Sequence, residues 1–370
     1  MRANACVKSL SHAHTFTRAH SAILTPNNMY GRNSVLTVGP NPALQRVLTF
    51  DQLSLGGVNR AAALSTYVGG KGQGAAMAAR LWAPDDQKIA VAQFLGGDSG
   101  RYVEQTLVEK GLTTITQQVS GPTRICTTLL HDGGTNTELI DPSDPVSADE
   151  LIAMAQSISA AMNDYGTVAL CGTQPPGAEL LYNMIATMLQ QAPSAAAATA
   201  EPLLLLDGFK QVNAVLASGR LDVLKLNLDE LSALTSCTDA RVAASTLLHG
   251  ADARLTRPGA MIAVTDGPRP ALLFQGRAAW RLTVPKLDAV NAIGAGDVCT
   301  GVFAHELAAA RRTAADATNT PIGGDAAADA FAWGLAAACA RVTSQLPTFE
   351  PERVRELRRE VLIEPLAWQV

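Results

Sequence analysis

The amino-acid sequence predicts an α/β protein with a doubly wound, mostly parallel sheet flanked by helices, together with a small antiparallel sheet. Short apolar runs that end in Gly, Asn or Asp recur along the chain, and such runs are typical of strands buried on both faces. Helical segments lie between these runs, as in a parallel sheet that is covered by helices on both sides. Two further regions alternate polar and apolar residues, which indicates strands with one face in water.

The main sheet is predicted from six apolar runs that alternate with five helices. The predicted strands are 35–38, 88–95, 167–172, 203–208, 223–227 and 261–267, and a further strand-like segment covers 280–284. The predicted helices are 74–82, 147–163, 178–191, 229–236 and 297–310. The helix at 147–163 begins with Ser147 and Glu150 at the spacing of a capping box.

The small antiparallel sheet is predicted from about 48–68 and 121–140, where polar and apolar residues alternate. Such a sheet could cover a site as a lid, and a pair of long surface hairpins is the alternative. Low-complexity stretches at 192–202 and 311–325 are interpreted as surface insertions.

Composition excludes several classes of protein. The chain has 370 residues, of which 47% are hydrophobic and 17% charged, so it is not a disordered chain. Its 29 Lys and Arg against 33 Asp and Glu give a net charge of −4, without the basic surplus of a general nucleic-acid binder. No apolar run reaches the roughly 18 residues that a membrane-spanning helix needs.

Residues 1–33 differ from the rest of the chain because they hold basic residues and no acidic one. This composition resembles an organellar transit peptide, and a disordered overhang that precedes Met29 is the alternative. We therefore expect a cytoplasmic protein, or a plastid or mitochondrial one if the tail is a transit peptide.

The segment Gly294-Ala295-Gly296-Asp297 opens a predicted helix. Small residues at a helix N-terminus let backbone N–H groups converge on an anion. A carboxylate there can take a proton from a hydroxyl that lies in line with a phosphate, which favours phosphoryl transfer with Asp297 as the base. Taken alone, a helix N-cap at Asp297 is the simpler interpretation.

A second glycine-rich segment, Gly69-Gly70-Lys71-Gly72-Gln73-Gly74, leads into the first predicted helix. It is not a P-loop, because no Ser or Thr follows the Gly-Lys pair. A glycine backbone that approaches a polar ligand at a helix start would fit it. Lys71 either adds positive potential there or is a solvated lysine.

Asn227 and Glu230 lie where a predicted strand passes directly into a helix. Three residues apart, both can face one point above the carboxyl edge of the sheet, where oxygen ligands suit Mg²⁺ held largely through water. A capping box between the two residues is the alternative.

Taken in chain order, the segments at 69–74, 227–230 and 294–297 resemble those of the PfkB (ribokinase-like) family of carbohydrate kinases. The resemblance covers the chain from about Val35 to Leu346. The resemblance implies one ribokinase-like kinase domain at 34–370, with lid strands from about 48–68 and 121–140, after a disordered or targeting tail at 1–33. It implies ATP and Mg²⁺, a small sugar or sugar-phosphate substrate, no nucleic-acid or membrane partner, and a possible homodimer through the lid.

The resemblance also implies roles for individual residues. Asp297 would be the base, and the backbone of Gly294, Ala295 and Gly296 would hold the developing charge. Asn227 and Glu230 would support the metal through water. The nucleotide would be bound by Lys225, Asn227, Thr265, Gly267, Gly294 and Gly296. The substrate would be bound by Gln45, Gly69, Gly70, Lys71, Gly74, Arg60, Arg124 and Asp297.

Within the family, the hexose-phosphate branch (1-phosphofructokinase and tagatose-6-phosphate kinase) is most similar. The resemblance rests on Asn41-Pro42-Ala43, Gly57-Val58-Asn59-Arg60, Gly121-Pro122-Thr123-Arg124 and the loop 171–177. It implies that Arg124, together with Arg60, anchors a phosphate that is already on the sugar.

Two departures from that branch affect the substrate. Gln45 stands where the branch has Asp, and Gly74 where it has Asn, so two groups that bind sugar hydroxyls are altered. Each lost contact to a hydroxyl costs about 1–3 kcal/mol, so a different substrate could be preferred. A non-catalytic binding or regulatory protein, and a kinase for another polyol or a nucleoside, therefore remain as alternatives.

Overall fold

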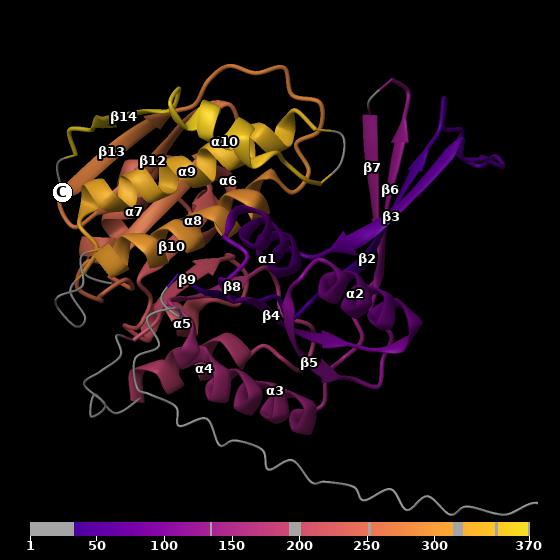
Figure 1. Ribbon diagram of the computed structural model, residues 1–370, viewed down its shortest axis with the longest axis horizontal. Coiled ribbons are helices and arrows are strands. Elements are labelled where there is room, and N and C mark those ends of the chain that lie inside the picture. Colours follow the sequence, from indigo (N-terminus) through magenta and orange to yellow (C-terminus); the bar gives the residue numbers. More distant parts are fainter. Residues whose placement is uncertain are drawn as a thin grey trace, which may run out of the picture.

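The structure contains a large sheet and a small sheet (Figure 1). It is a computed structural model that describes residues 33–133, 135–191, 201–250, 253–313, 321–344 and 347–368. The large sheet has ten strands in the order β14-β13-β12-β11-β10-β9-β8-β1-β4-β5. Its strands are β1 (Val35–Val38), β4 (Ile89–Leu95), β5 (Thr113–Gln118), β8 (Thr167–Cys171), β9 (Leu203–Asp207), β10 (Val223–Asn227), β11 (Met261–Asp266), β12 (Arg269–Gln275), β13 (Ala278–Thr283) and β14 (Leu362–Pro365).

Most of the large sheet is parallel, which confirms the predicted fold class. The seven neighbouring strands from β5 to β11 run parallel, and β12, β13 and β14 extend the other edge in antiparallel pairs. All six strands predicted from apolar runs lie in the parallel part. β5 was not predicted because its sequence, Thr-Thr-Ile-Thr-Gln-Gln, suits a half-exposed edge and contains no apolar run.

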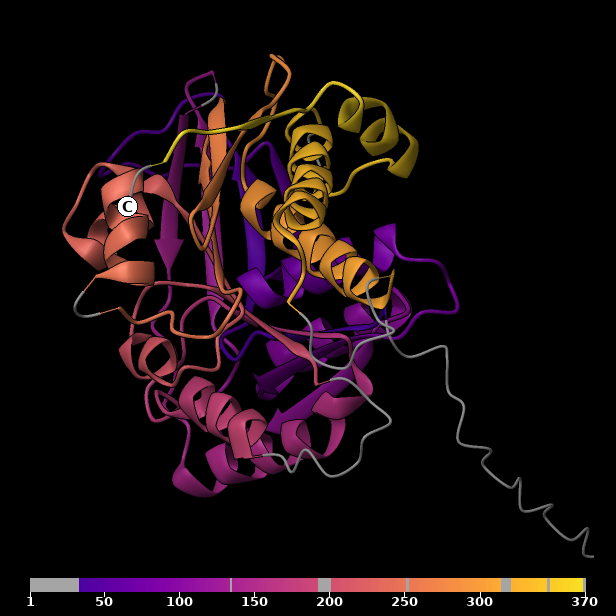
Figure 2. The same cartoon turned by 90° about the vertical axis from the view of Figure 1, so that its left-hand side faces the viewer.

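Helices cover both faces of the large sheet, and a side view shows the strands between two helical layers (Figure 2). Each layer closes one of two apolar cores, in which nearly all side chains are buried. One layer consists of α1 (Lys71–Trp82), α2 (Gly97–Glu109), α8 (Ala295–Thr313), α9 (Gly324–Val342) and α10 (Pro351–Arg358). The other consists of α3 (Ala148–Ala161), α4 (Leu181–Gln191), α5 (Asn213–Ala217), α6 (Leu228–Thr235) and α7 (Ala240–His249).

The small sheet has the strand order β3-β2-β6-β7 and extends away from the large sheet (Figure 1). The prediction that it is antiparallel was wrong at its centre, because β2 and β6 pair in parallel. β2 follows β1 and β6 follows β5, so both strands leave the carboxyl edge of the large sheet in the same direction. This pairing joins the two predicted regions into one sheet rather than separate hairpins. The strands are β2 (Ala43–Thr49), β3 (Ala63–Gly69), β6 (Ile125–His131) and β7 (Thr135–Ile140).

Helix α1 begins at Lys71, three residues earlier than predicted. Gly70 precedes it with a φ of 114°, a backbone conformation that favours glycine. A Cβ atom on Gly72 would lie 2.4 Å from the Cα atom of Gly39, so the start of α1 packs directly against the backbone that follows β1. Lys71 is therefore fixed in the first helical turn rather than carried on a loop.

Several predictions fall outside the described residues. The tail at 1–33 does so except for Asn33, and so do most of the insertion at 192–202 and the centre of the insertion at 311–325, where α8 ends at Thr313 and α9 begins at Gly324. In the described part of the chain, none of the helices has the length and apolar character to span a bilayer.

Candidate active site

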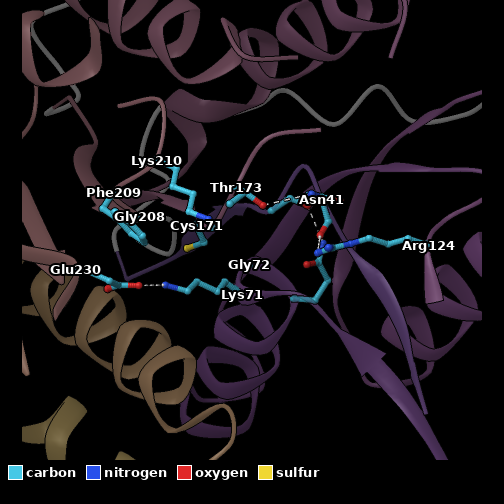
Figure 3. Close-up of a pocket in the computed structure, with 13 residues that line it drawn as sticks. Asn41, Lys71, Gly72, Arg124, Cys171, Thr173, Gly208, Phe209, Lys210 and Glu230 are labelled. Carbon is cyan, nitrogen blue, oxygen red and sulfur yellow. Dashed lines mark hydrogen bonds and ion pairs between the residues drawn. The ribbon is translucent and has the colours of Figure 1, made fainter. Parts of the chain in front are cut away.

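The strands β1 and β8 are neighbours, but the chain continues from β1 toward β4 on one side and from β8 toward β9 on the other. A crevice is expected at the carboxyl ends of strands at such a reversal of strand order. A cavity of about 220 Å³ lies there, lined by Gly39 after β1, Gly172 after β8 and Gly208 after β9 (Figure 3). Lys71 and Arg124 also line this cavity, which is the smaller of the two cavities described here.

Lys71 joins the glycine-rich segment to two acidic residues from other elements. Its Nζ atom lies 2.9 Å from Glu230 Oε1 and 3.3 Å from Asp207 Oδ1, and Figure 3 shows it directed at Glu230. Burial alone would lower the pKa of Lys71, but these two carboxylates raise it above its usual value. The interpretation of Lys71 as a solvated lysine is therefore wrong.

Asp207 is a buried carboxylate that the sequence analysis missed. It ends β9, and it accepts hydrogen bonds from Lys225 Nζ at 3.1 Å and from the hydroxyl of Thr300. Burial alone would raise the pKa of Asp207, but Lys225 and Lys71 hold it below its usual value. The sequence does give one signal for this residue, since a charge directly follows four buried leucines.

Lys225 connects the buried carboxylate to the start of α8. Besides the ion pair with Asp207, its Nζ atom donates to the carbonyl oxygen of Gly296 at 3.0 Å. Lys225 is itself buried, so the structure brings it to the predicted nucleotide side as a support for the Gly294–Gly296 backbone.

Asp297 lies in the first turn of α8, partly buried, and its side chain makes no hydrogen bond or ion pair among the described residues. Burial, together with the nearby carboxylate of Asp207, raises the pKa of Asp297 to about 7. The N–H of Ala295 donates to Ala292 O, whereas those of Gly296 and Asp297 meet no acceptor in the described segments. A helix start with free N–H groups is suited to bind an anion.

Asn227 and Glu230 form the capping box that the sequence analysis gave as the alternative. Asn227 Oδ1 accepts from the N–H of Glu230 at 2.8 Å, and Glu230 Oε2 accepts from the N–H of Asn227 at 3.0 Å. No cluster of three His, Cys, Asp or Glu suited to a metal ion occurs within the described ranges. The oxygens of Asn227, Glu230 and Asp207 fit a hard cation that keeps much of its water and is shared with phosphate groups.

Thr265 and Gly267 lie beside this capping box. Thr265 pairs with Asn227 across β10 and β11, and Gly267, with a φ of 55°, forms the turn between β11 and β12. The structure therefore brings the residues of the predicted nucleotide side together at one edge of the sheet.

A second cavity, of about 450 Å³, lies beside the start of α1 and contains the predicted base. A Cβ atom on Gly74 would lie 3.0 Å from the Cβ atom of Asp297, so the glycine at position 74 lets the start of α1 pack closely against the predicted base. Tyr67, which the sequence analysis did not select, also faces this larger cavity. The predicted residues that line it are Gln45, Gly69, Gly70, Gly74, Gly294 and Asp297.

The two predicted phosphate anchors lie far apart. Arg124 lines the smaller cavity at the base of β6, where it donates to the carbonyl oxygens of Asn41 at 3.1 Å and Pro42 at 3.3 Å. Arg60 is exposed in the segment that joins β2 to β3. Since Ala43 pairs with Gly69 at one end of these strands, that segment is at the opposite end of the small sheet. The structure does not bring Arg60 to the site of its own chain.

Comparison with known proteins identifies the family of this chain. The family model described as pfkB family carbohydrate kinase matches residues 43–353. The chain belongs to the PfkB family. This PfkB protein is therefore a kinase, a phosphotransferase of the carbohydrate kinase family, and the predicted resemblance is confirmed.

Solved structures share the ribokinase-like fold of this PfkB protein. Phosphofructokinase-2 from Escherichia coli in complex with fructose-6-phosphate has 19% identity and a TM-score of 0.71, over 88% of this chain and 98% of that chain. A possible 1-phosphofructokinase from Thermotoga maritima has 18% identity and a TM-score of 0.70, over 90% and 99%. A ribokinase from Thermotoga maritima has 19% identity and a TM-score of 0.66, over 88% and 99%.

Proposed function

We propose that this PfkB protein transfers the γ-phosphoryl group of ATP to a hydroxyl of a sugar or sugar phosphate, with Asp297 as the general base. The observation that carries the proposal is the carboxyl of Asp297 at the start of α8, with a pKa raised to about 7. A base whose pKa lies near the working pH is both available and strong enough to take a proton in the transition state.

The bond changes follow from this arrangement. The hydroxyl oxygen of the sugar forms a bond to the γ-phosphorus as its proton passes to Asp297, and the bond between that phosphorus and the bridging oxygen breaks, so that ADP leaves with the electron pair. The free N–H groups of Gly296 and Asp297 and the dipole of α8 stabilise the negative charge on the phosphoryl oxygens.

The residues around Asn227 fit a role in holding Mg²⁺ with ATP. When bound, the ion would neutralise charge on the phosphates. Asn227 and Glu230 would hold its water ligands, because their own oxygens already take part in the capping box. Lys71 and Lys225 keep Asp207 ionised, which preserves a negative charge near that position.

The smaller cavity supports an acceptor that already has a phosphate group. Three cationic side chains and one carboxylate line it: Lys71 is paired with the carboxylate, Glu230, and Arg124 and the exposed Lys210 are the other two cations. The guanidinium of Arg124 has no carboxylate within ion-pair distance among the described residues, so it is available to a ligand anion. A hexose phosphate therefore fits better than a neutral polyol or nucleoside.

The test is ADP release from ATP and Mg²⁺ by the full chain, across a panel of sugars, sugar phosphates and nucleosides, with Asp297→Asn as the control. We expect turnover with a hexose phosphate and a loss of about three orders of magnitude or more in the variant. Turnover with neutral sugars or nucleosides alone would reject the phosphate-anchor assignment. Nucleotide binding without turnover on any acceptor would favour the non-catalytic alternative.

We also propose that two copies associate through the small sheet. The strand register puts Leu48, Leu64, Leu129 and Leu139 on the face opposite Gln45, and all four are at least partly exposed. Leu64 is 55% exposed and Leu139 is 53% exposed. An apolar face of this kind on a sheet is typical of an interface between protein chains.

A further inference from the structure

The small sheet holds a chain of hydrogen bonds that ends at Gln45. The side-chain Nε2 of Gln45 on β2 lies 2.9 Å from Thr128 Oγ1 on β6. Thr128 Oγ1 in turn lies 2.8 Å from Glu138 Oε1 on β7. Thr128 is 1% exposed and pairs directly with Glu138, so the three side chains form a row across neighbouring strands.

Elementary hydrogen-bond chemistry fixes the direction of this row. An ionised carboxylate such as Glu138 can only accept, so Thr128 must donate its single hydroxyl proton to it. Thr128 can then only accept from Gln45, so the amide nitrogen of Gln45 must face Thr128. The amide oxygen of Gln45 must therefore point away from Thr128. The hydrogen bonds of the row, and not the shape of the amide, determine this orientation.

Gln45 and Gly69 both line the larger cavity, and the amide oxygen of Gln45 lies on the side of Gly69. A Cβ atom on Gly69 would come within 3.3 Å of Gln45 Oε1. None of the residues that the structure describes donates a hydrogen bond to this oxygen. Gln45 and Asp297 line the same cavity, so the oxygen is an unused acceptor in the cavity that holds the proposed base.

We propose that Glu138, acting through Thr128, holds the amide of Gln45 so that its oxygen accepts a hydrogen bond from a hydroxyl of the substrate. This inference rests on the proposed sugar kinase function and specifies its substrate, which must present a hydroxyl donor at this point. Gln45 is then a specificity-determining residue, and Thr128 and Glu138 are positioning residues. The negative charge that fixes the acceptor lies two strands away from the substrate instead of at position 45.

A pair of variants at position 128 tests the central link. Thr128→Val keeps the shape of the side chain but removes the hydroxyl, and Thr128→Ser keeps the hydroxyl. We expect Thr128→Val to raise the KM for the acceptor about tenfold with little change in the KM for ATP, because the amide of Gln45 loses the hydrogen bond that holds its oxygen toward the acceptor, and a tenfold change corresponds to about 1.4 kcal/mol, close to the value of one hydrogen bond. Thr128→Ser should stay within about threefold of the wild type. Equal KM values in both variants would overturn the proposal.

An exchange of the carboxylate tests the direction of the row. In Gln45→Glu, one hydroxyl proton faces two carboxylates, so we expect the acceptor KM to rise tenfold or more. In the double variant Gln45→Glu/Glu138→Gln, Thr128 can donate to Glu at 45 and accept from Gln at 138, so the KM should return to within about threefold of the wild type. Purely additive effects of the two substitutions would contradict the proposal.

The same cycle, measured as the midpoint of thermal unfolding, gives a readout that does not depend on turnover. Gln45→Glu should lower the midpoint, and addition of Glu138→Gln should restore it. An enzyme that shows no turnover while this unfolding cycle remains non-additive would reject the proposed function and keep the hydrogen-bond row. If the effects of the two substitutions on the unfolding midpoint are additive, the hydrogen-bond row is rejected, whether or not the enzyme shows turnover.

Discussion

At the scale of single residues, the feature with the clearest consequence for stability is the raised pKa of Asp297, the proposed base. Its pKa is raised to about 7 by burial and by the nearby carboxylate of Asp207, while Lys71 and Lys225 oppose the rise. In the unfolded chain an Asp has a pKa of about 3.9. The folded protein therefore binds a proton at Asp297 more tightly than the unfolded chain does, and ionisation of Asp297 costs folding free energy.

This linkage predicts the pH dependence of a stability difference. Wild type should lose stability relative to Asp297→Asn as the pH rises from about 4 to about 7, and the difference should stay constant above that range. We expect Asp297→Asn to unfold a few degrees above wild type at pH 8 and at the same temperature near pH 4. Thermal unfolding across this range measures the effect, and a variant less stable than wild type at pH 8 would contradict it.

At the scale of elements, the start of α1 sets the geometry of the site. The close approach of Gly72 to Gly39 holds α1 against the end of β1, and Lys71 in the same turn reaches the ends of β9 and α6. The glycine at position 72 is therefore needed for backbone packing, whatever the predicted approach of a ligand requires. A residue with a side chain at position 72 would have to push the helix away from the sheet.

We therefore predict that Gly72→Ala lowers the free energy of unfolding by about 1–3 kcal/mol, because its Cβ atom would meet the backbone of Gly39 at 2.4 Å. Gly323→Ala is the matched control, since Gly323 has a φ of −63° and no described atom would lie within 4 Å of its Cβ atom. Urea unfolding compares the two variants. An equal loss of stability in both would show that the contact at Gly39 has no special cost.

The elements also show what a sequence can and cannot predict. Six strands could be predicted from apolar runs, because a strand that is buried on both faces has an apolar side chain at nearly every position. Helix α9 was missed because it is buried on most sides and has no amphipathic period. The parallel pairing of β2 with β6 and the ion pairs of Asp207 depend on contacts between segments far apart in the chain. Local patterns do not contain that information.

In the candidate site, too, some features could be predicted from local sequence and others required the fold. Motifs selected Asp297 and the residues around Asn227, because each of these patterns is local to the start of one helix, and the structure places them at the starts of α8 and α6. The bonding of Lys71, and the row from Gln45 to Glu138, required the fold, since their partners come from other strands and helices.

At the scale of the whole molecule, the small sheet extends from the body that holds the proposed nucleotide side, with Gln45 on one face of the sheet and leucines on the other. If two copies pair through the leucine face, each small sheet is fixed over its own site by its partner. Assembly and substrate binding would then depend on the same four strands.

We predict that Leu139→Arg converts a dimer in solution into a monomer, because a charge buried at an apolar interface without a partner is strongly unfavourable. The control is Val242→Arg, a change at a similarly exposed apolar residue, at 55%, on helix α7. Light scattering coupled to size-exclusion chromatography measures the mass of both variants. A wild type that is monomeric, or a Leu139→Arg variant that stays dimeric, would reject the proposed interface.

The measurement that tests the central claim most directly is the dependence of kcat/KM for the best acceptor on pH, for wild type and for Asp297→Asn. If Asp297 is the base, wild-type kcat/KM should rise tenfold per pH unit at low pH and level off above an apparent pKa of about 7. The variant should show a residual rate without this titration. A wild-type profile that is flat between pH 5 and pH 9, or a variant that retains the same titration, would contradict the assignment of Asp297 as the base.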